Sequence, residues 1–436
     1  MRINSEGIAI LNQYFFLPQD KELVNGAKNS LILDFHTGGI YRINESARRI
    51  IESGEKGFRV LEAAKELELE PSDISSFVKS LSDQGLIQLS PCPKPNIPKV
   101  DKQISTQLDF LWIETTSRCN LHCLHCYADA EPTQVPDLST EEIKRLIDEV
   151  ADMGCKKIQF TGGECTLRGD LTDLIEYARL RGFELIEIFT NGTLLTESMI
   201  KYFAHAGINV AMSIYSYRPE THDFITGVKG SFEKTLNSLK FLLAYDVPTR
   251  CATTAMKQNE DELDETSYYL QHLGVQSRFP DPVRPTGRGS GMEKWPQKYG
   301  LKTIRTAPNF VANKQFYERN ISQNSCWFGK VAITNEGNVL PCVFARDQVA
   351  GNIKNQSLKD IIENNILKFW ALTVDKIEIC KDCEYRYLCH DCRPWAYGFT
   401  GNLYAKSPRC TYNPYTGEWG NAKNALTPNI QSIKAY

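Results

Sequence analysis

The chain has 436 residues, enough for about two to four domains, and 42% of them are apolar, so a sizeable core can form. Its formal net charge of −3 argues against a general nucleic-acid binder or a protein of anionic membrane surfaces. No apolar run reaches the roughly 18 residues of a membrane helix, and the N-terminus lacks the apolar core of a secretion signal. We therefore expect a cytoplasmic protein with no nucleic-acid and no membrane partner. Fourteen cysteines in a reducing compartment indicate metal ligands rather than disulfides.

Residues 1–90 have the pattern of a small domain in which strands precede helices. Strands are predicted at residues 8–16, 30–35 and 40–43, followed by three helices and a short return strand at 86–89. The first helix is expected to begin after Asn44, the second spans 58–67 and the third begins after Ser72, because Asn and Ser are good helix caps. This order of elements predicts a winged-helix domain.

Many winged-helix domains bind DNA, but the charge of this one argues against that role. Residues 1–98 contain 11 Lys and Arg against 13 Asp and Glu, whereas a domain that reads DNA needs a basic face. A structural cap and a recognition domain remain as interpretations. Residues 91–107 begin with a proline-rich run and are predicted to be a semi-rigid linker, which sets the first domain boundary.

The stretch Ser117–Tyr127 follows a predicted strand and places Cys119, Cys123 and Cys126 at C-x3-C-x2-C spacing. Such short steps let three thiolates surround one centre. Three thiolates are one short of the four that normally hold a [4Fe–4S] cluster, and a metal with an open position can bind a substrate or cofactor. A zinc site completed by a nearby histidine, or a group of free thiols, is the alternative that the spacing alone leaves open.

This loop resembles that of the radical S-adenosylmethionine (SAM) superfamily, in which C-x3-C-x2-C is accompanied by an aromatic residue. The resemblance implies that Cys119, Cys123 and Cys126 hold a [4Fe–4S] cluster whose fourth iron binds the amine and carboxylate of SAM. It also implies cleavage of SAM to a 5′-deoxyadenosyl radical, with Tyr127 near the adenine. An external electron donor such as a flavodoxin or ferredoxin is implied as a partner.

Strands and helices alternate from residue 110 to about 281. Six parallel strands are predicted, at 110–116, 157–161, 185–190, 208–214, 249–255 and 275–279. Ser139 and Glu142 form a capping box for the first helix between them. We therefore expect an α/β fold with a partial, TIM-like (β/α)6 barrel over residues 108–305 and a site at the carboxyl ends of its strands. An open doubly wound sheet is the alternative, but no G-x-G-x-x-G follows the first strand.

The ends of the predicted strands carry more of the family pattern. Gly162, Gly163 and Glu164 follow the second strand, and the resemblance implies that they bind the amino group of SAM. The chemistry is sound, because glycines permit close approach of the backbone and a carboxylate pairs with an ammonium group. Asn191 after the third strand and Ser213 at the end of the fourth are the other expected cofactor contacts, although Asn191 could equally serve as a cap or turn residue.

A second group of cysteines lies in the C-terminal part of the chain, residues 306–436. A hairpin is predicted over residues 330–343, with Cys342 on its return strand. Two C-x2-C pairs follow closely, which is a strong metal signal, and one zinc ion is the alternative occupant. The cysteines resemble those of the SPASM domain of radical SAM enzymes. That resemblance implies two further [4Fe–4S] clusters, one on Cys380, Cys383, Cys389 and Cys410 and one, a ligand short, on Cys326, Cys342 and Cys392.

Ahead of a radical SAM domain, residues 1–90 resemble the precursor-peptide recognition element of enzymes that modify ribosomally made peptides. The resemblance implies that a leader peptide adds a strand beside Ile40, Tyr41, Arg42 and Ile43. We expect a radical SAM oxidoreductase that forms a thioether, carbon–carbon or ether bond in a precursor peptide. The alternatives are oxidation of a protein side chain, modification of a tetrapyrrole, and a metal-sensing DNA-binding protein. No general acid or base can be named from the sequence.

Overall fold

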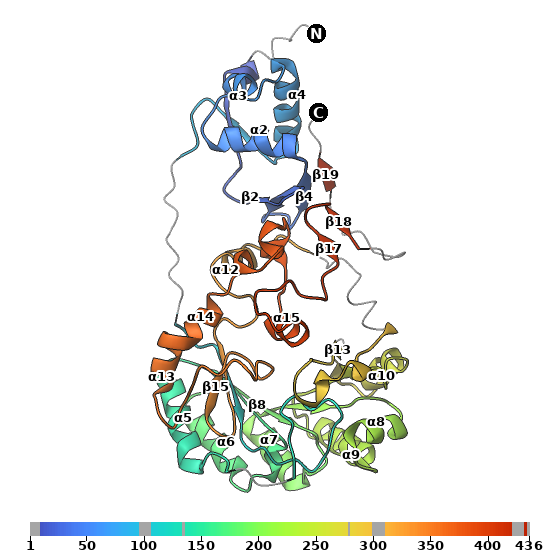
Figure 1. Cartoon of the computed structure of the whole chain (residues 1–436). Helices are drawn as coiled ribbons and strands as arrows, with labels where there is room; N and C mark the ends of the chain where they lie inside the picture. Colours follow the sequence, from blue (N-terminus) through green and yellow to red (C-terminus); the bar gives the residue numbers. More distant parts are fainter. Residues whose placement is uncertain are drawn as a thin grey trace.

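The computed structural model describes residues 9–95, 106–132, 136–277, 280–298, 310–420 and 431–433. Figure 1 shows three levels. The N-terminal unit (residues 9–95) lies at the top, the cysteine-rich segment (residues 310–420) in the middle, and a parallel sheet with its helices at the bottom. None of the helices within these ranges combines the length and apolar character needed to cross a bilayer.

The N-terminal unit packs helices α2, α3 and α4 against a four-stranded sheet of order β19-β4-β3-β2. Its core includes Phe15, Ile32, Ile51 and Val78, each almost fully buried. A separate antiparallel pair, β1 with β5, closes the unit. The elements are β1 (Tyr14–Phe16), β2 (Lys21–Asn25), β3 (Ser30–Asp34), β4 (Ile40–Ile43), α2 (Glu45–Glu55), α3 (Val60–Glu66), α4 (Pro71–Asp83), β5 (Gln88–Ser90) and β19 (Gln431–Ile433).

Several predictions for this unit are confirmed and others are wrong. Asn44 caps α2 by accepting a hydrogen bond from the Ala47 N–H at 3.0 Å. The strand expected over 8–16 is a helical turn at 9–11 followed by the short β1, and residue 8 lies outside the described residues. Strand β2 was not predicted, because its lysine and glutamate dilute the apolar signal. Helix α4 begins at Pro71 after Glu70, not after Ser72, since proline suits the first helical position.

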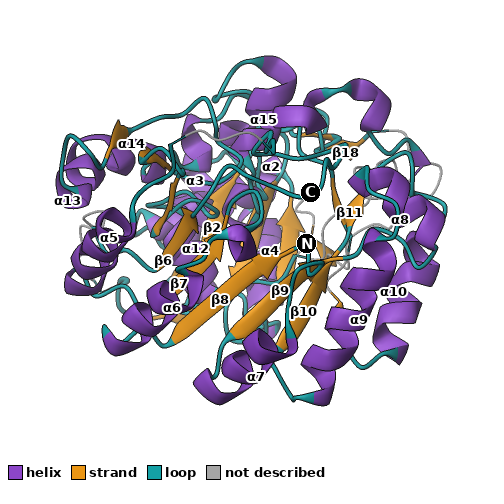
Figure 2. Ribbon diagram, turned by 90° about the horizontal axis from the view of Figure 1, so that it is seen from below, coloured by secondary structure: helices purple, strands orange, loops and turns teal. Residues whose placement is uncertain are grey.

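The central sheet has the order β12-β10-β9-β8-β7-β6-β14-β15-β16, and its first six strands are parallel. Figure 2 shows these strands surrounded by helices, which confirms the partial parallel sheet. The capping box at Ser139 is present on α5. The elements are β6 (Phe110–Glu114), α5 (Thr140–Asp152), β7 (Lys157–Thr161), α6 (Leu171–Leu180), β8 (Leu185–Thr190), α7 (Glu197–Ala206), β9 (Asn209–Ser213), α8 (Pro219–Thr226), α9 (Ser231–Ala244), β10 (Thr249–Ala252), α10 (Leu263–His272) and β12 (Gln276–Ser277).

The strand predicted at 249–255 is interrupted: β11 (Thr254–Ala255) leaves the sheet after β10 and pairs with β13 (Asp281–Pro282). Residues 278 and 279 of the last predicted strand lie outside the described residues. Strand β13 is followed by a glycine-rich connector, residues 284–291.

The cysteine-rich segment continues the central sheet instead of standing apart from it. Strand β14 pairs in parallel with β6, and β15 and β16 follow it in antiparallel order. Cys342 lies just beyond β15, not on it as predicted, because the chain bends at residues 341–344. The elements are α12 (Lys314–Asn320), β14 (Lys330–Ile333), β15 (Asn338–Leu340), β16 (Gly351–Asn352), α13 (Leu358–Ile361), α14 (Leu367–Trp370), α15 (Arg393–Thr400), β17 (Tyr412–Asn413) and β18 (Glu418–Trp419).

Candidate functional site

The first cysteine group lies on the loop that leaves the carboxyl end of β6. The backbone N–H groups of Leu121 and Ala130 donate to the sulfur atoms of Cys119 and Cys126, each at 3.4 Å. Burial raises the pKa of Cys119 to about 11 and that of Cys123 to about 12, and repulsion from the neighbouring thiols adds to both shifts. All three are free thiols that lie close enough to repel one another when ionised, so holding all three as thiolates requires a positive centre between them.

The glycine-rich connector after β13 holds this loop in place. The Arg288 side chain donates to the carbonyl of Cys123 at 2.9 Å and to that of Ala130 at 3.0 Å, and its backbone N–H donates to the carbonyl of Cys126 at 2.9 Å. Gly287 has a φ of +54°, and a Cβ there would lie 2.5 Å from the Cys126 carbonyl oxygen. The connector is therefore packed against the cysteine loop and fixes its backbone.

The turn after β7 lies directly against the cysteine loop. The backbone N–H groups of Gly163 and Glu164 donate to the carbonyls of Thr116 and Arg118, both at 2.8 Å. A Cβ on Gly162 or Gly163 would come within 2.5 or 2.2 Å of those same two carbonyl oxygens, respectively, so only glycine fits. The expected SAM-binding turn and the expected cluster loop therefore form one surface.

Glu164 is buried and links this turn to the end of β8. Its carboxylate accepts hydrogen bonds from the hydroxyls of Thr166 and Thr190, both at 2.6 Å, and from the backbone N–H of Asn191 at 2.8 Å. The Asn191 side chain approaches the Cys119 sulfur at 4.0 Å. The carboxylate is thus held in one orientation by fixed donors, which preorganises it for a cationic ligand.

Ser213 at the end of β9 lies beside Tyr215, a residue that sequence reasoning missed. Burial raises the pKa of Tyr215, repulsion from the Cys123 thiol adds to the shift, and a hydrogen bond with Ser213 opposes it. The Tyr215 ring meets that of His125 edge-on, with 4.6 Å between centroids. The contacting rings of Tyr215 and His125 therefore connect Ser213 with the cysteine loop.

Tyr127 points toward the cysteine-rich segment. Its ring contacts Phe344 edge-on, with 5.2 Å between centroids. Burial and the charge of Glu114 raise the Tyr127 pKa. Glu114 is itself buried at the end of β6, where Arg346 donates to both carboxylate oxygens at 2.6 and 2.8 Å. The expected adenine contact for Tyr127 stays a prediction.

The seven C-terminal cysteines form two sets in space. Burial raises the pKa of Cys342 to about 12 and that of Cys392 to about 11, and Cys326 adds to both shifts. Burial also raises the pKa of Cys380 to about 12, and the Cys410 thiol adds to it, as it does for Cys383 and Cys389. The two sets are those that the SPASM resemblance implies, while the ligand roles of their members stay predictions.

Three charged residues outside the expected site accompany these sets. The Asp391 carboxylate adds to the raised thiol pKa in both sets, so it lies between them, and it forms a buried ion pair with Arg393. Arg284 of the connector opposes the raised pKa of the Cys326 set. It lies over the Phe344 ring at 5.0 Å. Nothing in the sequence around Asp391 and Arg393 indicated these positions.

The donor chemistry of all three groups fits iron–sulfur clusters. Each group consists of free, partly buried thiols, and the first also has backbone N–H groups aimed at sulfur. Within the described ranges, no three His, Cys, Asp or Glu side chains gather tightly enough to bind one metal ion. A cluster makes a different demand, because each thiolate binds its own iron atom and the thiolates stand farther apart than the ligands of one zinc ion.

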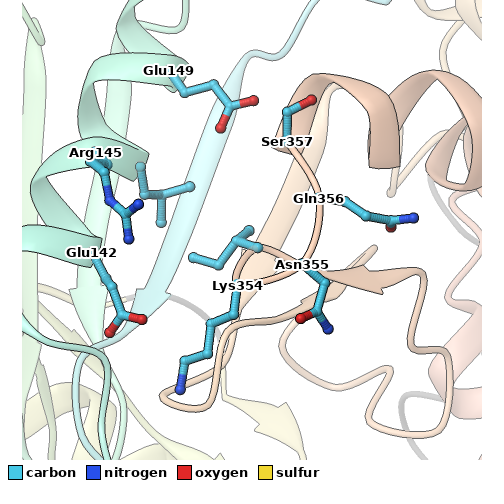
Figure 3. Close-up of a pocket in the computed structure, with 9 residues that line it drawn as sticks. Glu142, Arg145, Glu149, Lys354, Asn355, Gln356 and Ser357 are labelled. Atoms are coloured by element: carbon cyan, nitrogen blue, oxygen red, sulfur yellow. The ribbon is translucent and has the colours of Figure 1, made fainter.

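Two other features of the structure lie away from the cysteine groups. The pocket drawn in Figure 3 lies between α5 and residues 353–357. Its lining includes the charged residues Arg145, Glu149 and Lys354 and contains no cysteine.

The residues expected to bind a leader peptide lie on β4, in the N-terminal unit. The outer edge of that strand carries β19 in this structure.

Comparison with known proteins agrees with this geometry. Residues 113–268 match the model of the radical SAM superfamily, and residues 326–384 match that of the SPASM iron–sulfur cluster-binding domain. The AdoMet-dependent heme synthase of Methanosarcina barkeri is 31% identical over 339 residues, covering 69% of this chain and 95% of the synthase. The chain belongs to the radical SAM superfamily. As a radical SAM enzyme with a SPASM domain, it has SAM and iron–sulfur clusters as its implied cofactors.

One further relative and one solved structure of similar fold have names that mention a bacteriocin and a precursor peptide. The antilisterial bacteriocin subtilosin biosynthesis protein AlbA of Bacillus subtilis is 26% identical over 316 residues, 69% of this chain and 70% of AlbA. The crystal structure of SuiB from Streptococcus suis, bound to precursor peptide SuiA, superposes with a TM-score of 0.54 at 15% identity. That likeness of fold covers 91% of this chain and 98% of SuiB.

Proposed function

We propose that this radical SAM enzyme forms a thioether, carbon–carbon or ether bond in a ribosomally made precursor peptide. The observation that carries the proposal is the N-terminal unit, which we regard as a winged-helix recognition domain stacked on the cysteine-rich segment (Figure 1). The likeness of fold to SuiB covers 91% of this chain, whereas the sequence similarity to the heme synthase and to AlbA covers 69% of it in each case. An added recognition domain is what a peptide substrate with a leader needs.

When bound, SAM and the clusters supply the 5′-deoxyadenosyl radical and accept the electron that bond formation releases. The chain's own residues position these groups. We assign Cys119, Cys123 and Cys126 to the cluster that binds SAM, with Glu164 facing the SAM ammonium and Arg288 fixing the loop. The remaining SAM contacts in the proposal are Tyr127, Gly162, Gly163, Asn191 and Ser213.

The two C-terminal sets of cysteines are assigned to two auxiliary clusters. The set of Cys326, Cys342 and Cys392 has three thiols and leaves an iron position open for a substrate group or another ligand. It is also the set beside Arg284, whose cation would favour the more negative, reduced state of a cluster there. We place the enzyme in the cytoplasm, with a flavodoxin or ferredoxin as electron donor.

Modification of a tetrapyrrole is the second candidate, because the heme synthase of M. barkeri shares 31% identity over nearly its whole length. The two candidates differ in their need for the N-terminal unit. A tetrapyrrole has no extended backbone and needs no strand addition, so residues 1–90 would then serve only as a cap.

The test begins with anaerobic reconstitution and analysis of bound iron, sulfide and zinc. About 12 iron and 12 sulfide per chain are expected for three [4Fe–4S] clusters. The reduced enzyme is then incubated with SAM and either an iron tetrapyrrole or short peptides encoded beside its gene. A peptide that loses a pair of hydrogens, with 5′-deoxyadenosine released, supports the proposal. Conversion of the tetrapyrrole with no change in any peptide would overturn the proposed peptide modification. One bound zinc ion in the C-terminal segment would show that the two auxiliary clusters are absent.

A further inference from the structure

The strand beside β4 comes from the far end of the sequence. Gln431, Ser432 and Ile433 of β19 pair in parallel with Tyr41, Arg42 and Ile43 of β4. Figure 1 shows β19 next to β4 at the top of the molecule, beyond the hairpin of β17 and β18. The sheet therefore ends on a strand that the N-terminal unit does not itself supply.

Without β19, the outer edge of β4 would present unpaired backbone N–H and C=O groups. Such an edge readily accepts an extended peptide, and its affinity comes from the backbone rather than from particular side chains. Ile43 is buried against the helices of the N-terminal unit and Ile40 is buried on the opposite face of the sheet, in a cluster with Tyr385, so β4 stays in place whether or not its edge is filled. The pairing with β3 on the other side of β4 holds it independently.

The hold of β19 on this edge is modest. Its described pairing spans three residues, whereas β2 and β3 pair over five. Each backbone hydrogen bond contributes only about 0.5–1.5 kcal/mol net. β19 belongs to the same chain, and Trp419 at the end of β18 is only twelve positions before Gln431, so the strand competes for the edge as an intramolecular segment, with an effective concentration on the order of 1 mM.

The edge strand is also connected to the cysteine-rich segment. Arg42 donates a hydrogen bond to the Tyr385 side chain, and its charge acts on the neighbouring Glu384. Both residues lie between Cys383 and Cys389 in the sequence. A strand bound beside Arg42 therefore lies one contact away from the proposed auxiliary cluster.

We propose that the outer edge of β4 is the docking edge for an extended segment of the peptide substrate, and that β19 is a resident strand which the substrate must displace. The inference rests on the proposed function for the identity of the incoming peptide. Its consequence is that the enzyme binds a leader more weakly than the bare edge would, and that only a peptide with a good strand-forming segment gains the site.

The experiment uses the full chain and a labelled peptide with the sequence of residues 427–436, TPNIQSIKAY. Binding is followed by fluorescence anisotropy with the wild type, Ser432→Pro and Ser432→Ala. Proline removes a backbone N–H and disfavours β pairing, so Ser432→Pro should release the edge. Alanine keeps the backbone donor and is the matched control.

If the bare edge binds the peptide with a Kd near 0.1 mM, β19 at an effective concentration of about 1 mM raises the apparent Kd of the peptide about tenfold. Ser432→Pro should therefore bind the probe about tenfold more tightly than the wild type and Ser432→Ala, which should resemble each other. Equal affinity in all three proteins, or no binding to any of them, overturns the inference. Hydrogen exchange gives an independent answer on the wild type. Excess probe that displaces β19 should speed exchange at residues 431–433 while residues 40–43 stay protected, and unchanged exchange at 431–433 would overturn the inference.

A second arm separates this inference from the proposed function. The leader half of a candidate precursor is added to the complex of the probe with Ser432→Pro. Displacement of the probe supports the docking edge even if that precursor is never modified, in which case only the proposed function fails. A precursor that is modified but does not displace the probe keeps the proposed function and overturns the docking edge.

Discussion

At the scale of single residues, the buried pair of Glu114 and Arg346 makes a prediction about charge. Removing the cation with Arg346→Met leaves a buried carboxylate unpaired, which costs about 3–5 kcal/mol of unfolding free energy. Burial already raises the pKa of Glu114 while Arg346 opposes the rise, so the variant should have a still higher pKa. Where the folded pKa of a carboxyl is raised above its unfolded value, the free energy of unfolding falls as the pH rises from the unfolded pKa to the folded pKa. The loss in urea unfolding should therefore be larger at pH 8 than at pH 5.5.

The control for this prediction is the double variant Glu114→Gln with Arg346→Met, which has no buried charge. It should be more stable than Arg346→Met at pH 8 and should show little difference between the two pH values. A single variant that loses the same free energy at both pH values would contradict the buried-charge argument.

His222 makes a prediction of the opposite sign. Burial lowers its pKa from 6.5 to about 4, and its Nδ1 accepts the Tyr215 N–H at 3.3 Å. The unfolded histidine takes up a proton first, so its contribution is complete above pH 6.5 and is lost as the pH falls toward 4, roughly 3 kcal/mol in all. Asparagine can accept the same hydrogen bond without titrating. His222→Asn should therefore lose less stability than the wild type between pH 7.5 and 5, measured by urea midpoints. The control is His272→Asn, on the exposed face of α10, which should follow the wild type.

At the scale of elements, the connector after β13 decides whether the cysteine loop is held. Gly287→Ala would place a Cβ 2.5 Å from the Cys126 carbonyl oxygen, so the connector must move away from the loop. Gly274→Ala is a matched control, because Gly274 also has a positive φ, +84°, but nothing lies within 4 Å of a Cβ there. Both changes cost about 1 kcal/mol of backbone strain, but only Gly287→Ala should also lower the bound iron and the SAM cleavage rate. Equal iron content in the two variants would show that the connector is dispensable.

At the scale of the whole molecule, the N-terminal unit rests on the cysteine-rich segment through the turn between β2 and β3. The Ala27 N–H donates to the Asp382 carbonyl at 2.8 Å, the Lys28 N–H donates to the Pro414 carbonyl at 3.1 Å, and the Arg386 side chain donates to the Asn25 carbonyl. These contacts tie the expected recognition domain to the expected auxiliary cluster.

Arg386→Ala should loosen this junction without unfolding either part. Loss of a charged donor to a backbone carbonyl costs about 1–3 kcal/mol, so hydrogen exchange at residues 25–30 and 382–386 should become faster. Arg179→Ala, which removes an exposed pair with Glu176 on α6, is the control and should leave both segments unchanged. Unaltered exchange in the first variant would mean that other contacts hold the unit.

The sequence alone determined the features that depend on local order. The spacing of Cys119, Cys123 and Cys126 on a loop after a strand, the glycines before Glu164, and the alternation of strands and helices are all short-range patterns. Such patterns can be recognised without the fold, because strand periods, helix caps and ligand spacings are set by neighbouring residues. The parallel sheet, the cap of α2 and the capping box of α5 followed from them.

The tertiary structure decided what distant segments do to one another. The pairing of β14 with β6, the grip of Arg288 on the cysteine loop, the place of Asp391 between two cysteine sets and the position of β19 beside β4 join residues far apart in the chain. Backbone hydrogen bonds and single charges carry no sequence signature of their partner. Only folding therefore reveals that the edge predicted for a leader peptide is held by the protein's own strand.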